Sequence, residues 1–335
     1  MFKFLRGRKS PSREVADGPA AAVELATAED IRACFRLLLG REPNPEEWPG
    51  HSARAGEKLA TIVQSFLFSK EFSDRRLMQA NDLANYEFAT VDGLKIAASP
   101  SDLDVGKHVL AGHYEPHITS VFRREVKQGM GVLDVGANCG YFSFLALALT
   151  GPEGQVWAVE PNAGNVRLLE IAKRTNGTAN LTIVPAAAGL AFGSAKLNAA
   201  QSNGMVSQLS SAIEDASEAT LVCQIALDAL FPGVERLDFI KIDVEGGEYI
   251  ALKGLEHTLD RCHPKIVSEF SPGTMPGISG VTGKEYLEFL FQKAYHIGVV
   301  SPNGDVDRYH GSAAPILDAF QQSGVDHIDL LALPA

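Results

Sequence analysis

The sequence is poor in the features that mark metal-binding, secreted and membrane proteins. Its 335 residues include only four cysteines, which lie far apart, so neither a CxxC metal pair nor a disulfide framework is expected. No apolar run approaches the roughly 20 residues of a membrane span, and no apolar signal core follows the basic start MFKFLRGRKSPSR. These absences favour a cytoplasmic protein without a metal site. The amphipathic start leaves a peripheral membrane contact as the alternative.

Positive charge is also scarce. Lysine and arginine total 30 against 41 aspartates and glutamates, which gives a formal net charge of −11. Binding to nucleic acid without sequence preference requires a basic surface. We therefore expect no nucleic-acid partner, and a ligand that is neutral or cationic.

The pattern along the chain predicts three parts. Residues 1–26 form a basic tail and a linker rich in alanine and proline, residues 27–80 a small helical module, and residues 86–335 the main domain. Thr27, three residues before Asp30, predicts a capped helix start, because an acidic side chain at that spacing can bond back to the capping residue. Without further information the helical module is a packing cap.

Short apolar runs alternate with helical segments in the main domain. Runs that are apolar on both faces, alternating with helices, are typical of a parallel sheet covered on both sides. The predicted fold class is therefore α/β, with a Rossmann-like, mostly parallel sheet beside an all-α N-terminal module. The expected strands are 131–135, 155–160, 181–187, 237–244, 265–270, 296–301 and 327–333.

The phrase VLDVGANCGYFS predicts a ligand-binding turn. A buried strand places Asp134 near its carboxyl end, and Gly136 and Gly140 then let the backbone approach a ligand closely. Asn138 stands where a dinucleotide fingerprint requires glycine, so no pyrophosphate cradle is expected. Glu160 ends the next strand, where a carboxylate can accept hydrogen bonds from ribose hydroxyls. The pattern favours S-adenosylmethionine, a nucleoside without a pyrophosphate.

Two roles of Asp134 are compatible with the sequence. Its carboxylate balances the cationic tail of that cofactor, directly or through water, or it only caps the turn.

The phrase KIDVEGGE places further carboxylates near the same sheet edge. Asp243 ends a strand, Glu245 follows in the turn, and Glu269 ends the next strand. Such carboxylates can accept the proton of a hydroxyl or hold a divalent cation. We take Asp243, Glu245 and Glu269 as candidate catalytic residues. The alternative reading assigns Glu248 to a helix start and Lys241 to an ion pair.

Two further segments are candidates for the same site. In GHYEP, His113 is a candidate base, while Tyr114 and Glu115 are expected to cover the cofactor. Ala186, after the third strand, is expected near the adenine ring. Residues 199–209 either face the acceptor or form a plain hairpin, and the remaining histidines are interpreted as ordinary surface or core residues.

Several separate motifs together resemble the FkbM-type methyltransferases that use S-adenosylmethionine. The resemblance covers about residues 90–330 and implies a class I methyltransferase fold, S-adenosylmethionine as cofactor, and O-methylation, often of sugars. It also implies cofactor contacts for Pro161 and Asn162. The matching phrases are GHYEP (112–116), VLDVGANCGYFS (132–143), VEPNAGNVRLLE (159–170), LDFIKIDVEGGEYIALKG (237–254) and PKIVSEF (264–270).

The helical module carries a resemblance of its own. The phrases LLLGREPNPEEW and LATIVQSFLFSKEFSDR are similar to a small helical domain found beside bacterial sugar-modifying enzymes. That resemblance implies an interaction or targeting role, hence a protein partner, and it implies no chemistry.

The sequence is therefore interpreted as an O-methyltransferase that modifies a small-molecule or glycan hydroxyl by direct in-line transfer, with a carboxylate or histidine as base. One alternative is a nicotinamide or nucleotide-sugar enzyme on a similar sheet. A second is a protein that binds S-adenosylmethionine without catalysis. A nucleic-acid or protein N-methyltransferase is disfavoured, because the fourth strand ends in KIDVEGGE and no N-P-P-Y-type loop follows it.

Overall fold

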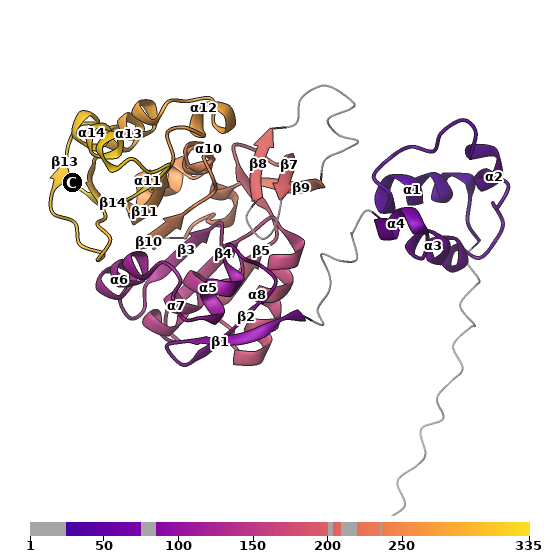
Figure 1. Ribbon diagram of the computed structural model, residues 1–335, viewed down its shortest axis with the longest axis horizontal. Coiled ribbons are helices and arrows are strands. Elements are labelled where there is room, and N and C mark those ends of the chain that lie inside the picture. Colours follow the sequence, from indigo (N-terminus) through magenta and orange to yellow (C-terminus); the bar gives the residue numbers. More distant parts are fainter. Residues whose placement is uncertain (1–24, 75–84, 200–203, 209–219, 235) are drawn as a thin grey trace, which may run out of the picture. The chain divides into compact units, whose positions relative to one another are not determined.

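The computed structural model describes residues 25–74, 85–199, 204–208, 220–234 and 236–335 (Figure 1). The chain divides into two compact units, Met1–Met78 and Gln79–Ala335. Most of the predicted tail, residues 1–24, lies outside the described residues. Within the described ranges, no helix is both long and apolar enough to cross a bilayer.

The first unit is helical and has a small aromatic core. The predicted helix cap is present: Thr27 Oγ1 accepts the Asp30 backbone N–H at 3.1 Å, and Asp30 Oδ2 accepts the Thr27 backbone N–H at 2.8 Å. The core is formed by Ile31, Phe35, Ile62 and Phe66. The helices are α1 (Ala28–Leu38), α2 (Trp48–Ser52), α3 (Leu59–Leu67) and α4 (Lys70–Asp74).

The second unit is built on an eight-stranded sheet. Its order is β13-β12-β14-β11-β10-β3-β4-β5. Neighbours from β11 to β5 are parallel, while β14 runs antiparallel to both β11 and β12. The strands are β3 (Gly131–Val135), β4 (Gln155–Val159), β5 (Leu181–Val184), β10 (Phe239–Ile242), β11 (Lys265–Phe270), β12 (Tyr295–Val299), β13 (Tyr309–His310) and β14 (Ile328–Pro334).

Helices cover both faces of this sheet (Figure 1). Successive residues of β3 show why: Val132 packs into one apolar cluster and Leu133 into the other, since side chains alternate along a strand. The first face carries α5 (Gly106–Leu110), α6 (Pro116–Glu125), α7 (Tyr141–Thr150) and α8 (Ala163–Asn176). The second carries α10 (Glu248–Lys253), α11 (Glu256–Cys262), α12 (Met275–Ile278), α13 (Gly283–Gln292) and α14 (Ala314–Ser323). The predicted Rossmann-like α/β class is confirmed.

Two smaller sheets complete the unit. The sequence also predicts strands within residues 86–97, and these form an antiparallel hairpin, β1 (Glu87–Val91) with β2 (Leu94–Ala98). A four-stranded sheet of order β6-β9-β7-β8 was not predicted. Its strands are β6 (Ala187–Gly189), β7 (Gly193–Ala199), β8 (Gly204–Gln208) and β9 (Thr220–Ala226), and the 3-10 turn η3 (Leu227–Leu230) follows.

The apolar pattern of residues 247–259 predicts a single helix, and this prediction is wrong, because the segment forms two helices, α10 and α11. A Cβ at Gly254, between them, would lie 2.0 Å from the carbonyl oxygen of Gly189, so only glycine allows this approach to the small sheet. Asp228 then caps the second helix by accepting the backbone N–H of Thr258 at 2.9 Å.

Candidate active site

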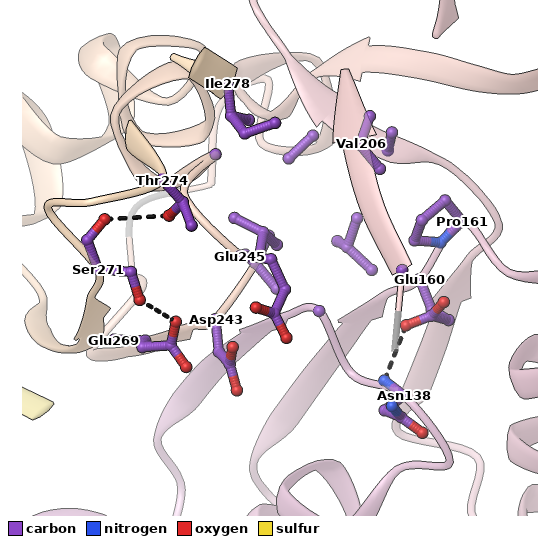
Figure 2. A pocket seen from close by; sticks show the side chains of 18 of the residues that line it. Asn138, Glu160, Pro161, Val206, Asp243, Glu245, Glu269, Ser271, Thr274 and Ile278 are labelled. Carbon is purple, nitrogen blue, oxygen red and sulfur yellow. Dashed lines mark hydrogen bonds between the residues drawn. The ribbon is translucent and has the colours of Figure 1, made fainter. Parts of the chain in front are cut away.

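A cavity of about 390 Å³ lies at the carboxyl ends of β3, β4, β10 and β11 (Figure 2). The chain builds the sheet from β3 outward through β4 and β5, and later through β10 and β11 on the other side. Ligands of open α/β sheets bind where the direction of building reverses. The pocket therefore lies where the topology predicts it.

The glycine turn after β3 forms part of the floor. Gly136 has φ +81° and a Cβ on it would lie 1.9 Å from the backbone oxygen of Asp243. The turns after β3 and β10 thus touch through their backbones, and only glycine permits it. Asn138 has φ +50°, and Gly140 (φ +96°) precedes α7 as its cap residue.

Glu160 is the anchor on the β4 side. Its side chain is buried, with Oε2 accepting the Asn138 backbone N–H at 2.8 Å and Oε1 accepting that of Asn162 at 2.7 Å. Burial raises the pKa of Glu160 to about 7, although these N–H groups oppose the shift. Oε1 also accepts a hydrogen bond from Asn165 Nδ2 at 3.4 Å. Oε2 can accept a second hydrogen bond, so the group can still receive a ribose hydroxyl.

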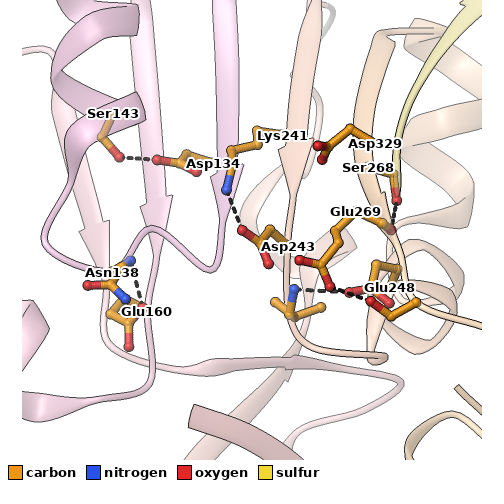
Figure 3. A network of polar contacts seen from close by, with 12 residues as sticks. Asp134, Asn138, Ser143, Glu160, Lys241, Asp243, Glu248, Ser268, Glu269 and Asp329 are labelled. Atoms are coloured by element: carbon orange, nitrogen blue, oxygen red, sulfur yellow. Dashed lines mark hydrogen bonds and ion pairs between the residues drawn. The ribbon is translucent and has the colours of Figure 1, made fainter. Parts of the chain in front are cut away.

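A buried ion pair lies beneath the pocket (Figure 3). Lys241 Nζ contacts Asp243 Oδ2 at 2.9 Å, and the lysine side chain is 5% exposed. Burial alone would lower the pKa of Lys241, but Asp243, Glu115 and Asp134 outweigh it and raise that pKa. Asp134 accepts a hydrogen bond from Ser143 at 2.5 Å. The predicted Lys241 ion pair is thus present.

Asp134 does not line the cavity. It is 1% exposed, and its Oδ1 has no hydrogen-bond partner among the described residues. Burial raises its pKa, with Lys241 acting in the opposite direction. When ionised, Asp134 therefore acts on the pocket electrostatically, through the low-dielectric interior. A direct contact between Asp134 and a ligand stays a prediction.

The far wall of the pocket carries the remaining carboxylates. Glu245 adopts φ +56° in the turn after β10, and Glu269 accepts a hydrogen bond from Ser271 Oγ at 2.6 Å (Figure 2). Burial and the nearby Asp243 carboxylate raise the pKa of both. Glu248 is fully buried and accepts the backbone N–H groups of Val244 and Gly246 at 3.0 and 3.1 Å. It shapes the turn that holds Asp243 and Glu245.

The segment before α6 supplies the wall above the lysine. Tyr114 and Glu115 line the pocket, and burial raises the pKa of Glu115 well above its usual range, with Lys241 opposing the shift. His113 does not line it; its side chain is exposed, because the turn after α5 bonds the His113 N–H to the His108 carbonyl and directs it outward. The expectation that His113 faces the reacting groups is therefore not supported.

Most of the predicted site residues meet at this cavity. The predicted residues that line it are Gly136, Asn138, Glu160, Pro161, Ala186, Tyr114, Glu115, Asp243, Glu245 and Glu269. Gly140 and Asn162 instead cap helices behind it, Asn162 by accepting the Gly164 N–H at 2.9 Å. Of the segment 199–209, Gly204 and Val206 line the cavity, while residues 200–203 and 209 lie outside the described residues.

Sequence reasoning missed six polar residues of the lining, namely Asp104, Gln224, Ser271, Thr274, Asp326 and His327. The reading of every other histidine as ordinary was wrong at two positions. His327 lines the pocket and its Nδ1 lies 2.9 Å from Asp326 Oδ1, and His117 Nε2 lies 2.8 Å from Asp329 Oδ2. The direction of β14 could have indicated that Asp326 and His327, which precede it, lie at the pocket. An antiparallel strand begins at the sheet edge where the parallel strands end.

The donor set suits a cationic nucleoside. Seven carboxyl groups line the cavity, and no lysine or arginine does among the described residues; the carboxyl groups belong to Asp104, Glu115, Glu160, Asp243, Glu245, Glu269 and Asp326. A sulfonium and an ammonium group would be attracted to this surface, and a pyrophosphate would be repelled. Within the described part of the chain, no group of three or more histidine, cysteine or acidic side chains is arranged to hold a metal ion.

The strand order and the pocket at the strand ends define a Rossmann-like α/β fold with a ligand site. Residues 134–297 match the family model of the methyltransferase FkbM domain. This match supports S-adenosylmethionine as the cofactor. No curated protein matches the chain.

Solved structures with similar folds include three methyltransferases. Methyltransferase FkbM from Methylobacillus flagellatus KT is 16% identical, with 90% of this chain and 58% of that chain covered and a TM-score of 0.39. Precorrin-6y C5,15-methyltransferase from Geobacter metallireducens GS-15 is 12% identical, with coverages of 72% and 94% and a TM-score of 0.39. An S-adenosylmethionine-dependent O-methyltransferase from Thermotoga maritima is 12% identical, with coverages of 66% and 64% and a TM-score of 0.37. The chain spans little more than half the length of the first.

Proposed function

We propose that the protein is an O-methyltransferase that transfers a methyl group from S-adenosylmethionine to a hydroxyl of a bacterial sugar or glycan. The observation that carries the proposal is the position of Asp243. Its carboxylate is fixed by Lys241 at 2.9 Å and lies between the Glu160 side and the Glu269 side of the cavity (Figure 2). A base for an acceptor hydroxyl belongs between the cofactor and the acceptor.

Each side of the pocket has a separate task in this proposal. When bound, S-adenosylmethionine supplies a methyl group carried on a positively charged sulfur. Glu160 and the turn at Gly136 hold the ribose and the tail, and the apolar residues Val135 and Ala186 exclude water. Asp243 then orients the acceptor oxygen and takes its proton at a carboxylate oxygen.

The sugar class of the acceptor is the less direct part of the proposal. It is supported by the sequence resemblance of the helical unit to modules found beside bacterial sugar-modifying enzymes. Under this proposal the helical unit binds a protein partner or a target near the glycan, and nucleic acid is not a partner. The acidic pocket agrees with that last point, because a polyphosphate chain would meet like charge.

The cofactor assignment is tested by calorimetry with S-adenosylmethionine and with NAD. Only the first should bind. Replacement E160A should weaken its binding by about 1.5–3 kcal/mol, because charge-assisted hydrogen bonds are lost. Binding of NAD alone would overturn the proposal, and unchanged affinity of E160A would remove the ribose contact.

The catalytic assignment is tested with D243N and methyl-labelled cofactor. The variant should bind cofactor with little change, because the amide can still bond to Lys241, yet turnover should fall at least 100-fold, within the range for loss of a general base. Full activity of D243N would show that another group accepts the proton. The matched control is D228N, which changes an equivalent carboxyl that caps α11 outside the pocket.

A further inference from the structure

The pocket has a second side that the cofactor residues do not occupy. Figure 2 shows Asn138 and Glu160 on one side and Glu269, Ser271 and Thr274 on the other, with Asp243 between them. If the cofactor binds to the first side, the acceptor must enter through the second. Ile278 lies on the same side, and Glu245, beside Asp243, is close enough to Asp326 and His327 for their charges to affect its pKa.

The acceptor side offers no group that would bind an anion strongly. Glu245, Glu269 and Asp326 contribute three carboxyl groups to it, and His327, whose Nδ1 contacts Asp326, is its only basic side chain among the described residues. The cation beneath the pocket is Lys241, and Asp243 already pairs with it at 2.9 Å. Phosphate sites in proteins instead present arginine, lysine or clustered backbone N–H groups.

The segments that flank β8 in the sequence contain no basic residue, and Lys196 of the adjacent strand β7 does not line the pocket. Strand β8 brings Gly204 and Val206 to the pocket. The segments on either side of it in the sequence, AQSN (200–203) and LSSAIEDASEA (209–219), contain no lysine or arginine and three acidic residues. The acidic character of this part of the chain is therefore not reversed by the residues that adjoin β8.

The remaining chemistry suits hydroxyl groups. The carboxyl groups and the Ser271 and Thr274 side chains can exchange hydrogen bonds with a polyol. The raised pKa of Glu269 adds a carboxyl proton that can be donated to a hydroxyl or ether oxygen. Ile278 provides an aliphatic surface for the carbon-bound face of a small ring.

Building on the proposed function, we propose that the acceptor is a hydroxyl compound without negative charge, such as a glycosidically linked neutral or amino sugar. Sugar phosphates, nucleotide-linked sugars and uronic acids are disfavoured, because the described lining offers no lysine or arginine to pair with their charge and the Asp326 carboxylate would repel it. Methylation would then follow the reaction that takes the sugar off its phosphate carrier, which is a glycosyl transfer or a phosphate-ester hydrolysis.

The experiment compares three acceptor pools with the full chain saturated with methyl-labelled S-adenosylmethionine. The pools contain the methyl glycosides of common hexoses, the same hexoses as 1-phosphates, and the same hexoses linked to nucleoside diphosphates. Saturation-transfer NMR measures binding, and label incorporation measures turnover. We expect the neutral pool to exceed both anionic pools at least tenfold in binding.

Each result separates the two proposals. The proposed selection against negatively charged acceptors is overturned by any of three results: preference for a phosphate-bearing pool, equal binding of all pools, or no binding of any pool to the cofactor-loaded protein. The methyltransferase assignment is tested separately, by cofactor binding. Failure to bind S-adenosylmethionine overturns the assignment itself and the selection that depends on it.

A charge reversal at the pocket mouth sharpens the test. Asp326 lines the pocket and its side chain is 93% exposed, so D326K should fold and should reduce the preference for the neutral pool at least threefold. The control is D318K, which makes the same charge change on α14 at an exposed position outside the lining and should leave the preference unchanged. Equal behaviour of the two variants would contradict the role of local charge.

Discussion

Carboxyl groups of the helical unit and carboxyl groups around the pocket of the sheet unit are held in opposite ways. In the helical unit they are satisfied: hydrogen bonds from Arg41 lower the pKa of Glu47, and those from Arg54 lower that of Glu57. In the sheet unit burial raises the pKa of Glu160 and Glu248 to about 7. The first arrangement stabilises the fold. The second costs stability and marks a functional site, because folding alone gives no reason to bury unpaired acids.

The comparison predicts opposite responses to pH, and this is the largest expected effect. A raised folded-state pKa contributes stability below about pH 4.5 that is lost as the pH rises through about 7. Without cofactor, Glu160 and Glu248 together should therefore lose about 5 kcal/mol of this stability between pH 5 and 8. The lowered pKa values of the helical unit give stability that is present above their usual range and lost as the pH falls.

The two tryptophans allow each unit to be followed separately. Trp48 lies in α2 and Trp157 in β4, and the chain has no other. Urea unfolding of W157F reports on the helical unit, and that of W48F reports on the sheet unit. The same pH dependence in both units would contradict the contrast. Saturating S-adenosylmethionine should flatten only the Trp157 response, because a cation favours the ionised carboxylates.

The second prediction concerns the glycine contact between the two pocket turns. The replacement G136A adds a Cβ that would lie 1.9 Å from the Asp243 backbone oxygen. Cofactor affinity should fall about 100-fold, which corresponds to about 2.7 kcal/mol. G177A is the matched control: Gly177 has φ +65°, ends α8 and has no atom within 4 Å of an added Cβ. Calorimetry checks affinity, and equal losses in both variants would mean that backbone strain alone is responsible.

The third and smallest effect is expected in the helical unit. Arg41 makes two hydrogen bonds to Glu71, at 2.6 and 2.7 Å, and also contacts Glu47. The replacement R41M should lower the unfolding free energy reported by Trp48 by about 1–2 kcal/mol and should leave cofactor affinity unchanged. In the control R36M, an exposed pair at 3.7 Å is lost and little change is expected. Loss of cofactor binding in R41M would show that the units depend on each other.

The positions of site residues were predicted best where a strand ends at the site. Glu160 and Asp243 follow buried parallel strands, so their position at the pocket edge could be predicted from the strand pattern alone. The capping box at Thr27 could also be predicted from the sequence, because its two hydrogen bonds join residues only three positions apart.

Contacts between distant segments could not be predicted in this way. Asp326 and His327 reach the pocket because β14 is antiparallel, and strand direction is set by the packing of the whole sheet. The turn at His113 exposes one side chain and directs the next two inward, and the phrase GHYEP does not encode that choice. The small sheet was missed because its strands β7 and β9 are partly exposed and carry only weak apolar alternation.

The position of β14 has a consequence for biosynthesis. This strand comes last among the described strands, yet it is inserted in the interior of the sheet between β11 and β12. Until it has emerged from the ribosome, β11 leaves an apolar edge without a partner, and such edges pair readily with other chains. Newly made chains should therefore need shielding by a chaperone until this strand is in place.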